Sequence, residues 1–444
     1  MHYLTASNTI TFLVDKATPT GAPTYTAITT GGKTLADAPL TPNASWPSGT
    51  VQWVDKDGKP LPAATQVQAN TEYTWSFTPA DTANYNGATG SVTLYAVSSG
   101  GGSSSGGGGS SSASKTTTTT NADGSVTKTE TKSDGTVVET TTGKDGSTTK
   151  TETKKDGSSV TETKAADGST GTVKTDKNGQ TTAETALSSK AIETAKRNGE
   201  PVTAPIEVET TRNSDTAPTV KIELPRNSGD TKVEIPVTNV KPGTVAVLVH
   251  PDGTEEIVKN SLPTEDGIQL TVDGNATVKI VDNSKDFADT RNHWAKDAID
   301  FVSARGLVNG MSATIYAPNN STTRAQMWTI LARQNDADLT GGSIWYEKAQ
   351  NWAKEKGISD GTNPNGTINR AQMVTMLWRT VGQPAATDKV SFADVPAGSY
   401  YAQAVAWAVE GGITTGVGGG RFDPNSTCTR AQIAAFLYRL YLSR

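Results

Sequence analysis

Three arginines occupy the same position in three copies of a short motif in the last third of the chain. Each motif has Thr or Asn, then Arg, Ala and Gln: Thr323–Gln326, Asn369–Gln372 and Thr429–Gln432. A Thr or Asn three residues before a Gln forms a capping box at a helix start, which accounts for both of those residues. The arginine needs another explanation, because a cation at the first helical position opposes the helix dipole at a cost of about 0.3 to 1 kcal/mol.

An anion bound at each helix start would provide that explanation. A carboxylate there would meet a guanidinium fork and unpaired backbone N–H groups. We therefore predict an anion site, and we expect that removing the arginines leaves the thermal stability unchanged or slightly raised. The candidate binding residues are Arg324, Arg370, Arg430, Gln326, Gln372 and Gln432. The rival interpretation is an internal salt bridge from each arginine to an acid such as Asp289 or Asp394.

Residues for other kinds of chemistry are scarce in this sequence. The three histidines, His2, His250 and His293, have no metal-ligand spacing, and the single cysteine, Cys428, forms neither a disulfide framework nor a Cys/His dyad. Paired glycosidase carboxylates are not excluded by the sequence, although nothing marks a cleft. We predict that the chain is not an enzyme and has no catalytic residues, no metal and no cofactor.

Two helices in each copy would position the motifs. With Gly306, Gly357 and Gly412 in register, apolar residues recur at helical spacing before each glycine, which is suited to end the helix in the left-handed conformation. The aligned aromatic positions are Trp294, Trp345 and Tyr400, then Phe301, Trp352 and Trp407. A second helix follows each motif. One helix–loop–helix unit is too small to bury its own apolar face, so we expect the three units to pack on one another.

Aromatic and acidic residues near the first helices add to the candidate site. Trp294, Trp352 and Trp407 could stack on sugar faces, although their helical spacing is more typical of a packed core. Asp289 and Asp394 precede first helices, where each is either a helix cap or a partner for glycan hydroxyls.

Further residues extend the repeated pattern toward a known family. They are Phe287-Ala288-Asp289, His293-Trp294-Ala295 and Phe392-Ala393-Asp394. Together with the three motifs, they resemble the S-layer homology family over the last third of the chain. Two departures are the Gln in place of the family's usual Glu, and a middle copy without Phe-x-Asp. The resemblance implies a three-pronged assembly whose inter-repeat grooves bind secondary cell-wall polysaccharides, often pyruvylated, with the motif arginines central to recognition.

The residues before the helical copies favour β-structure. Alternating aromatic residues between 21 and 97 predict a β-sandwich that resembles the immunoglobulin-like repeats of bacterial surface proteins. A Gly/Ser linker follows at 98–114. Asp-Gly or Asn-Gly turns then recur every 11 residues from Asp123-Gly124 to Asn178-Gly179, and predict two-residue hairpins in either a Thr-rich β-meander or a disordered stalk. Hydrophobic alternation returns in a small β-domain at 201–284.

Composition excludes some partners. The formal net charge is -5 with a sequence pI near 5.4, so the chain lacks the basic footprint of a nucleic-acid-binding protein. No segment is apolar enough to insert into a membrane. The first residues contain no secretory signal, and they start so abruptly in strand-like sequence that we expect a fragment or a truncated start.

These observations predict a multidomain fold: all-β N-terminal and middle domains, followed by an all-α three-repeat helical assembly. The expected segments are a tail or preceding β-repeat at 1–20, then 21–97, 98–114, a stalk at 115–200, 201–284, and repeats at 285–335, 336–383 and 384–444. We expect an extracellular protein of a Gram-positive type envelope that anchors non-covalently to an anionic wall polysaccharide, with self-association in a surface layer left open. The alternative is the wall-anchoring tail of a larger exported enzyme.

Overall fold

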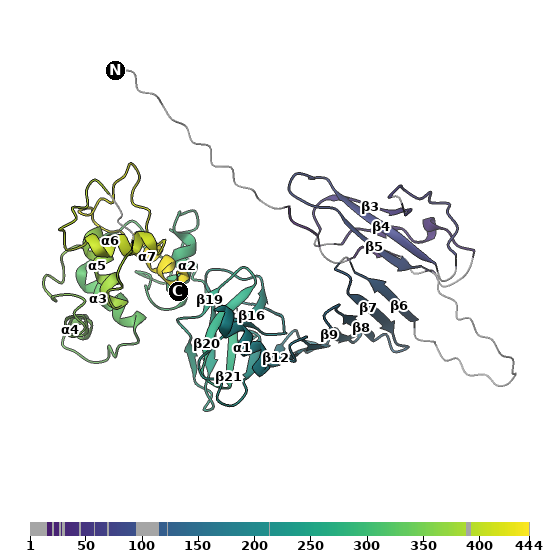
Figure 1. Ribbon diagram of the computed structural model, residues 1–444, viewed down its shortest axis with the longest axis horizontal. Coiled ribbons are helices and arrows are strands. Elements are labelled where there is room, and N and C mark those ends of the chain that lie inside the picture. The colour runs from purple at the N-terminus through teal and green to yellow at the C-terminus, as the bar shows by residue number, and fades with distance from the viewer. Residues whose placement is uncertain are drawn as a thin grey trace, which may run out of the picture. The chain divides into compact units, whose positions relative to one another are not determined.

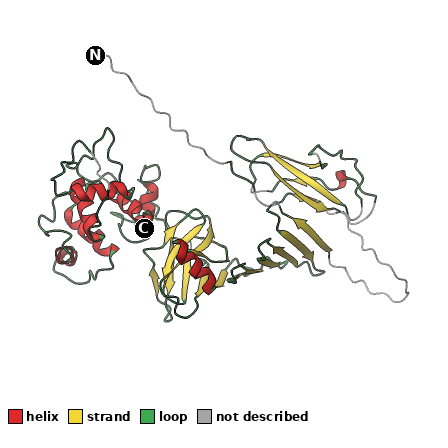
Figure 2. Cartoon of the chain, in the orientation of Figure 1, coloured by secondary structure: helices red, strands yellow, loops and turns green. Residues whose placement is uncertain are grey.

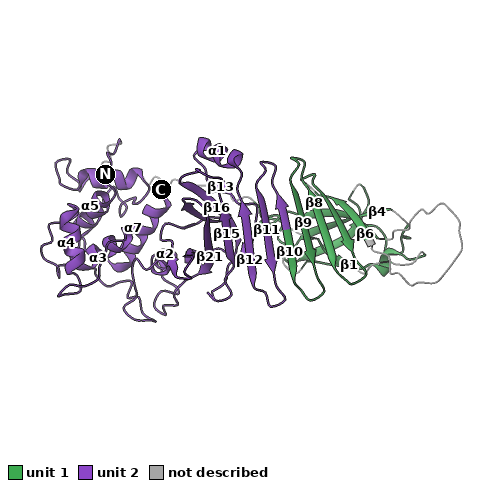
Figure 3. Cartoon of the chain, turned by 90° about the horizontal axis from the view of Figure 1, so that it is seen from below, with its two compact units in different colours: residues 1–161 green, residues 162–444 purple. Residues whose placement is uncertain are grey.

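The computed structural model describes residues 16–19, 22–25, 28, 32–43, 46–56, 58–68, 71–94, 115–121, 123–212, 214–387 and 392–443. Most of the predicted tail at 1–20 and the whole Gly/Ser linker at 98–114 lie outside the described residues. The chain divides into two compact units, residues 1–161 and 162–444 (Figure 3). This division falls inside the segment predicted as a stalk.

The N-terminal part of unit 1 is built on a three-stranded antiparallel sheet (Figure 1). Its strands are β3 (Gly49–Val54), β4 (Glu72–Pro79) and β5 (Ala88–Thr93); β1 (Thr24–Tyr25) pairs separately with β2 (Leu40–Thr41), and a 3-10 turn, η1, covers Leu35–Asp37. Tyr73, Trp75 and Phe77 alternate along β4 and are buried, and the Trp46 and Phe77 rings lie 4.6 Å apart between centroids. The aromatic alternation therefore forms a core, while the immunoglobulin-like identity stays a prediction.

The rest of unit 1 is an antiparallel ribbon of short strands. These are β6 (Lys115–Thr120), β7 (Val126–Thr131), β8 (Val137–Thr142) and β9 (Thr148–Thr153), and β10 (Ser159–Lys164) contains the boundary between the units. Cross-strand Thr pairs link the strands, as between Thr127 and Thr141, whose hydroxyl oxygens lie 2.8 Å apart. Of the two alternatives for this segment, the structure shows the β-meander.

The turns of this ribbon differ from the predicted two-residue hairpins. In the second turn, the N–H of Lys132 donates to the carbonyl of Thr136 at 2.8 Å, and the N–H of Gly135 donates to the carbonyl of Lys132 at 3.0 Å. This is a three-residue loop, in which Gly135 takes the left-handed position with φ 88°. The Asp134 carboxylate accepts from the N–H of Thr136 at 2.8 Å, so both residues of the Asp-Gly pair stabilise the loop.

Unit 2 begins with the middle domain, whose two sheets pack around a buried apolar core. One sheet contains β11 (Thr170–Thr175), β12 (Thr181–Ala186), β15 (Thr219–Glu223), β21 (Ala276–Asp282), β17 (Thr244–Val249) and β18 (Glu255–Ile257). The other contains β13 (Val202–Thr203), β14 (Val208–Glu209), β16 (Thr231–Thr238), β20 (Gly267–Val272) and β19 (Leu262–Pro263). β12 and β15 run parallel, which requires a crossover, and helix α1 (Ser189–Asn198) lies in that connection.

The C-terminal part of unit 2 contains three helix pairs. They are α2 (Lys296–Ala304) with α3 (Arg324–Gln334) in repeat 1, α4 (Glu347–Glu355) with α5 (Arg370–Thr380) in repeat 2, and α6 (Ala402–Glu410) with α7 (Arg430–Leu442) in repeat 3. Gly306, Gly357 and Gly412 follow the first helices with φ of 66°, 67° and 67°, as predicted. The buried apolar residues of all three repeats form one core.

A closed ring of backbone hydrogen bonds joins the three repeats just before their second helices. The N–H of Thr322 donates to the carbonyl of Cys428 at 3.1 Å, Cys428 donates to Ile368 at 2.9 Å, and Ile368 donates back to Thr322 at 2.9 Å. Cys428 is fully buried there, and burial raises the pKa of its thiol to about 12. Each repeat therefore contributes one extended residue to a cyclic contact.

The predicted division into all-β and all-α parts is wrong. Helix α1 belongs to the middle domain, so that domain is not all-β (Figure 2). The helices cover less than half of the described residues after 285, and the remainder is loop, turn and isolated β-bridges, such as Ser321 with Thr429 and Thr323 with Thr367. The physical reason is that the residues preceding each second helix are extended and pair with the other repeats, as shown by Thr323 with φ −84° and ψ 162°.

Candidate functional site

The three motifs lie where the sequence predicts, at the starts of α3, α5 and α7. Each forms a capping box: the side chain of Thr323, Asn369 or Thr429 accepts from the N–H of the Gln three residues on, and that Gln accepts from the cap residue's N–H. The side chains of Gln326, Gln372 and Gln432 therefore have a structural partner, the N–H of Thr323, Asn369 or Thr429.

The backbone N–H groups at these helix starts are not open to an anion. The N–H of Arg324 donates to the carbonyl of Gly366 at 2.9 Å, and the N–H of Ala325 donates to that of Pro364 at 3.0 Å. The same pair of bonds joins repeat 2 to repeat 3, and repeat 3 to repeat 1. A loop of the next repeat thus occupies each helix start, and this part of the predicted anion site is wrong.

The motif arginines cross from one repeat to the next in the same cyclic order. Arg324, Arg370 and Arg430 are only 9%, 4% and 6% exposed. Their Nε atoms donate to the carbonyls of Thr362, Phe422 and Tyr316, at 2.8, 2.8 and 2.9 Å. These contacts account for the arginines without a bound anion at the helix start, because each guanidinium donates to a carbonyl group in a loop of the neighbouring repeat.

The rival interpretation, an internal salt bridge, holds for one of the three arginines, but the acid is neither Asp289 nor Asp394. Arg324 forms an ion pair with Asp360, whose side chain is 64% exposed. The N–H of Thr362 holds the pKa of Asp360 below its ordinary value. Arg430 instead donates to the carbonyl of Asn309 at 2.6 Å, and Nη2 of Arg370 is buried without a hydrogen-bond partner among the described residues.

Asp289 and Asp394 act on loops instead of capping helices. The Asp289 carboxylate accepts from the N–H groups of Tyr316 and Ala317, at 2.9 and 2.7 Å. Asp394 accepts from Phe422 and Asp423, both at 2.8 Å. Burial opposes ionisation of both carboxyls, but the backbone hydrogen bonds outweigh it and hold both pKa values below the ordinary range. These two acids position the carbonyls that the arginines bind.

Two grooves between the repeats have matching walls. Groove 1 has a volume of about 170 Å³ and groove 2 of about 440 Å³. Groove 1 is lined by Asn309, Gln326, Thr329, Arg333, Trp345 and Arg430, among others. The corresponding residues of groove 2 are Asp360, Gln372, Thr375, Arg379, Tyr400 and Arg324. Each groove therefore draws on all three repeats: a loop and second helix from one, an aromatic residue from the next and a motif arginine from the third.

Sequence reasoning missed four of these groove residues. Trp345 and Tyr400 are 65% and 59% exposed, as is the aligned Trp294 at 66%, whereas Trp352 and Trp407 are partly buried against the core. The alignment places Trp294, Trp345 and Tyr400 together at one position, yet of these three only Trp294 is among the residues predicted to bind a glycan. Arg333 and Arg379 occur at the same place in α3 and α5, a recurrence visible in the sequence.

The grooves combine exposed rings with cationic side chains. Arg379 donates to the carbonyl of Ile358 at 3.1 Å, which orients its guanidinium at the wall of groove 2. Burial lowers the pKa of Arg333 in groove 1. Such surroundings suit a ligand that has a flat apolar face and an anionic group.

The S-layer homology domain family matches residues 286–327 and 391–434, which contain the motifs of repeats 1 and 3. The chain carries S-layer homology domains. The match covers the ring contacts of Thr322 and Cys428, and repeat 2 lies between the two matched regions with its own capping box and helix pair. S-layer homology domains mark a cell-surface anchoring region.

Several curated proteins resemble this part of the chain. An amylopullulanase of Thermoanaerobacterium thermosulfurigenes is 31% identical over 181 residues, which are 35% of this chain and 9% of that protein. The exoglucanase XynX of Acetivibrio thermocellus is 31% identical over 186 residues, 36% of this chain and 17% of that protein. An S-layer protein of Bacillus thuringiensis subsp. finitimus is 27% identical over 175 residues, 34% and 21% respectively. The chain spans between 9% and 21% of the length of these relatives.

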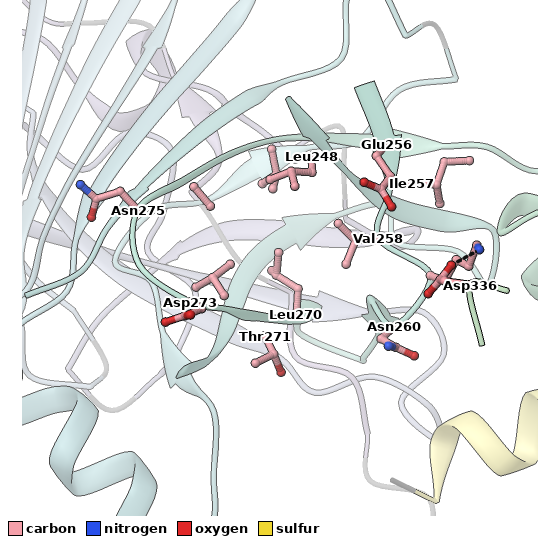
Figure 4. Close-up of a pocket in the computed structure, with 14 residues that line it drawn as sticks. Leu248, Glu256, Ile257, Val258, Asn260, Leu270, Thr271, Asp273, Asn275 and Asp336 are labelled. Atoms are coloured by element: carbon pink, nitrogen blue, oxygen red, sulfur yellow. Dashed lines mark hydrogen bonds and ion pairs between the residues drawn. The ribbon is translucent and has the colours of Figure 1, made fainter. Parts of the chain in front are cut away.

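In the described part of the chain, no helix has both the length and the apolar character of a membrane span. No cluster of three or more His, Cys, Asp or Glu side chains is arranged to hold a metal ion there. A further pocket of about 360 Å³ lies at the edge of the middle domain, with Asn275 at one end and Asp336, from the loop after α3, at the other (Figure 4). This pocket has neither the arginines nor the exposed aromatic residues of the grooves.

Proposed function

We propose that the chain anchors non-covalently to the cell wall by binding an acidic polysaccharide in grooves 1 and 2. The observation that carries this proposal is the matching of the grooves, each with an exposed aromatic ring, two arginines, a Gln and a Thr at corresponding places. Two copies of one surface in one chain are expected when a repetitive polymer is bound at two points, because avidity then exceeds the affinity of a single site.

The aromatic and cationic residues would have separate roles. Trp345 and Tyr400 offer ring faces for the apolar face of a sugar, and Arg333 and Arg379 offer charge-assisted hydrogen bonds to a carboxylate. A ketal-linked pyruvate is the acidic substituent that we propose.

The acidic substituent can be tested on the polymer without altering the protein. Purified wall polymer is treated with mild acid to remove ketal pyruvate, and a second sample has its uronates reduced instead. We expect the depyruvylated polymer to lose most of its binding in a sedimentation assay with the full chain, and the uronate-reduced polymer to keep it. Undiminished binding of the depyruvylated polymer would contradict pyruvate as the recognised group, and undiminished binding of a third sample that has undergone both treatments would contradict an acidic ligand altogether.

A second candidate function is the wall-anchoring tail of a longer exported enzyme. Two relatives are named as enzymes, the amylopullulanase and the exoglucanase, and the matched segment is 9% and 17% of their lengths. For the present chain we propose no catalytic activity. Determining the native N-terminus of the cellular protein by mass spectrometry separates the two candidates: a catalytic domain upstream of residue 1 would favour the second.

A further inference from the structure

Arg305, the residue after α2, is buried in a contact between repeat 1 and the middle domain. It is 1% exposed. Its Nη2 donates to the carbonyls of Thr244 at 3.0 Å and Ser261 at 2.6 Å, and its Nη1 donates to that of Pro242 at 3.2 Å. The guanidinium also stacks on the ring of Phe301, 3.6 Å from the centroid. One side chain of repeat 1 thus binds three backbone carbonyls of the middle domain.

This arginine is not needed to build a repeat. The aligned positions are Lys356 in repeat 2 and Gly411 in repeat 3, and both residues are exposed. No carboxylate contacts Arg305 among the described residues, and burial lowers the pKa of its guanidinium to about 9. A buried cation without a carboxylate partner carries a large desolvation cost, so its presence points to a role in fixing one specific arrangement.

A second contact lies just after α3. Nζ of Lys259 donates to the carbonyl of Arg333 at 2.9 Å and forms an ion pair with Asp336, which lies at the end of the pocket in Figure 4. The residue aligned with Asp336 in repeat 2 is Gly382, which has no side chain to make this contact. Asn283 adds a third bond, from Nδ2 to the carbonyl of Ala304 at 2.6 Å.

These contacts hold the two walls of groove 1. One wall of groove 1 is the loop that begins at Val308, three residues after Arg305. The opposite wall is helix α3, where Arg333 lines the groove and its backbone carbonyl accepts from Lys259. Both walls of groove 1 are thus fixed to the middle domain. Ala304 of α2 also packs in one apolar cluster with Val245 of that domain. Groove 2 has no counterpart of the Arg305 and Asp336 contacts, and its volume is larger, at about 440 Å³ against about 170 Å³ for groove 1.

We propose that the middle domain is a clamp that holds groove 1 in a narrow, preorganised form, so that the two grooves bind the polymer unequally. Arg305 and Lys259 are positioning residues, since they act on groove 1 through its walls. The ligand part of this inference rests on the proposed function. The mechanical part does not, and it can be measured on the free protein.

Hydrogen exchange of the full chain tests the clamp without a ligand. In Arg305→Met, and separately in the milder Lys259→Ala/Asn283→Ala variant, we expect amide exchange in residues 307–311 to rise about tenfold while residues 358–362 are unchanged. Lys356→Met, the matched change in repeat 2, should alter neither segment. Unchanged exchange at 307–311 in both clamp variants, or an equal rise in both segments, would overturn the proposal.

Binding of purified pyruvylated wall polymer then tests the inequality of the grooves. In a Tyr400→Ala background, where only groove 1 is intact, the clamp variants should weaken binding about tenfold, because a preorganised site loses affinity when it must be ordered on binding. In a Trp345→Ala background they should have no effect. Equal effects in both backgrounds would contradict the clamp, whereas an unaltered parent chain that fails to bind the polymer would refute the proposed function and leave the exchange result to decide.

Discussion

The β6–β10 ribbon and the three helical repeats are both built by repeating a short sequence, yet only the helical repeats close on themselves. In the ribbon, each strand pairs with its neighbours, and Thr, Lys and Glu face solvent on both sides. In the helical repeats, backbone bonds run from repeat 1 to 2, 2 to 3 and 3 back to 1. Closure creates surfaces shared by different repeats, and both grooves lie on such surfaces.

The largest effect is expected from breaking the closure. Arg370→Ala removes a buried guanidinium that donates to Phe422 and lies over its ring, 4.7 Å from the centroid. The carbonyl of Phe422 would lose its charged partner, so we expect a loss of about 2 to 4 kcal/mol in the unfolding free energy of the helical region. Chemical denaturation followed by tryptophan fluorescence measures this loss.

The control for that experiment is Arg291→Ala. Arg291 forms an exposed ion pair with Asp286, and its removal should cost less than about 0.5 kcal/mol. A stable Arg370→Ala variant would support the sequence-based expectation that removing the motif arginines leaves stability unchanged, whereas the burial of all three arginines favours a loss of stability.

Acid should weaken the helical region through Asp289 and Asp394. Their folded-state pKa values lie below the ordinary value. The stabilisation is therefore complete above the unfolded pKa of about 3.9 and is lost as the pH falls through the folded pKa. Circular dichroism melts should show a drop in Tm below about pH 4 that is smaller in Asp289→Asn/Asp394→Asn. Asp266→Asn, at an exposed carboxylate, should keep the full drop, and identical profiles for all three proteins would refute the linkage.

Replacing Asp360 should have a smaller effect, a gain in binding instead of a loss. Asp360 pairs with Arg324 at groove 2, where groove 1 has Asn309 in the aligned position. An acidic ligand must compete with this carboxylate, so Asp360→Asn should strengthen binding of the acidic polymer at groove 2 about threefold. Calorimetric titration in the Trp345→Ala background measures it. Weaker binding would show that Asp360 itself contacts the polymer.

The ribbon should contribute least to anchoring. Deleting residues 137–158 removes two repeats and preserves the alternation of strand direction. Because the grooves lie wholly within unit 2, we expect wall affinity and the Tm of the helical region to change by no more than the error of measurement. A large loss of wall binding, with the helical circular dichroism intact, would assign the ribbon a binding role.

Local patterns predicted much of the helical region, because they depend on nearby residues. The capping boxes and the left-handed Gly306 follow from residues within one turn of a helix. The partners of Arg430 could not be predicted, since Tyr316 is 114 residues away and the contact exists only after the ring closes. The exposure of Trp345 could not be predicted either, because helical spacing alone does not reveal which face a neighbouring repeat leaves uncovered.

The most direct test of the account is wall binding by Trp345→Ala/Tyr400→Ala in the full chain. These rings are exposed, so the double variant should fold like the parent but lose most of its binding to purified walls in a sedimentation assay. Val417→Ala, at a similarly exposed apolar side chain that lines neither groove, should bind like the parent. If the double variant still binds walls as tightly as the parent, the grooves are not the anchoring site.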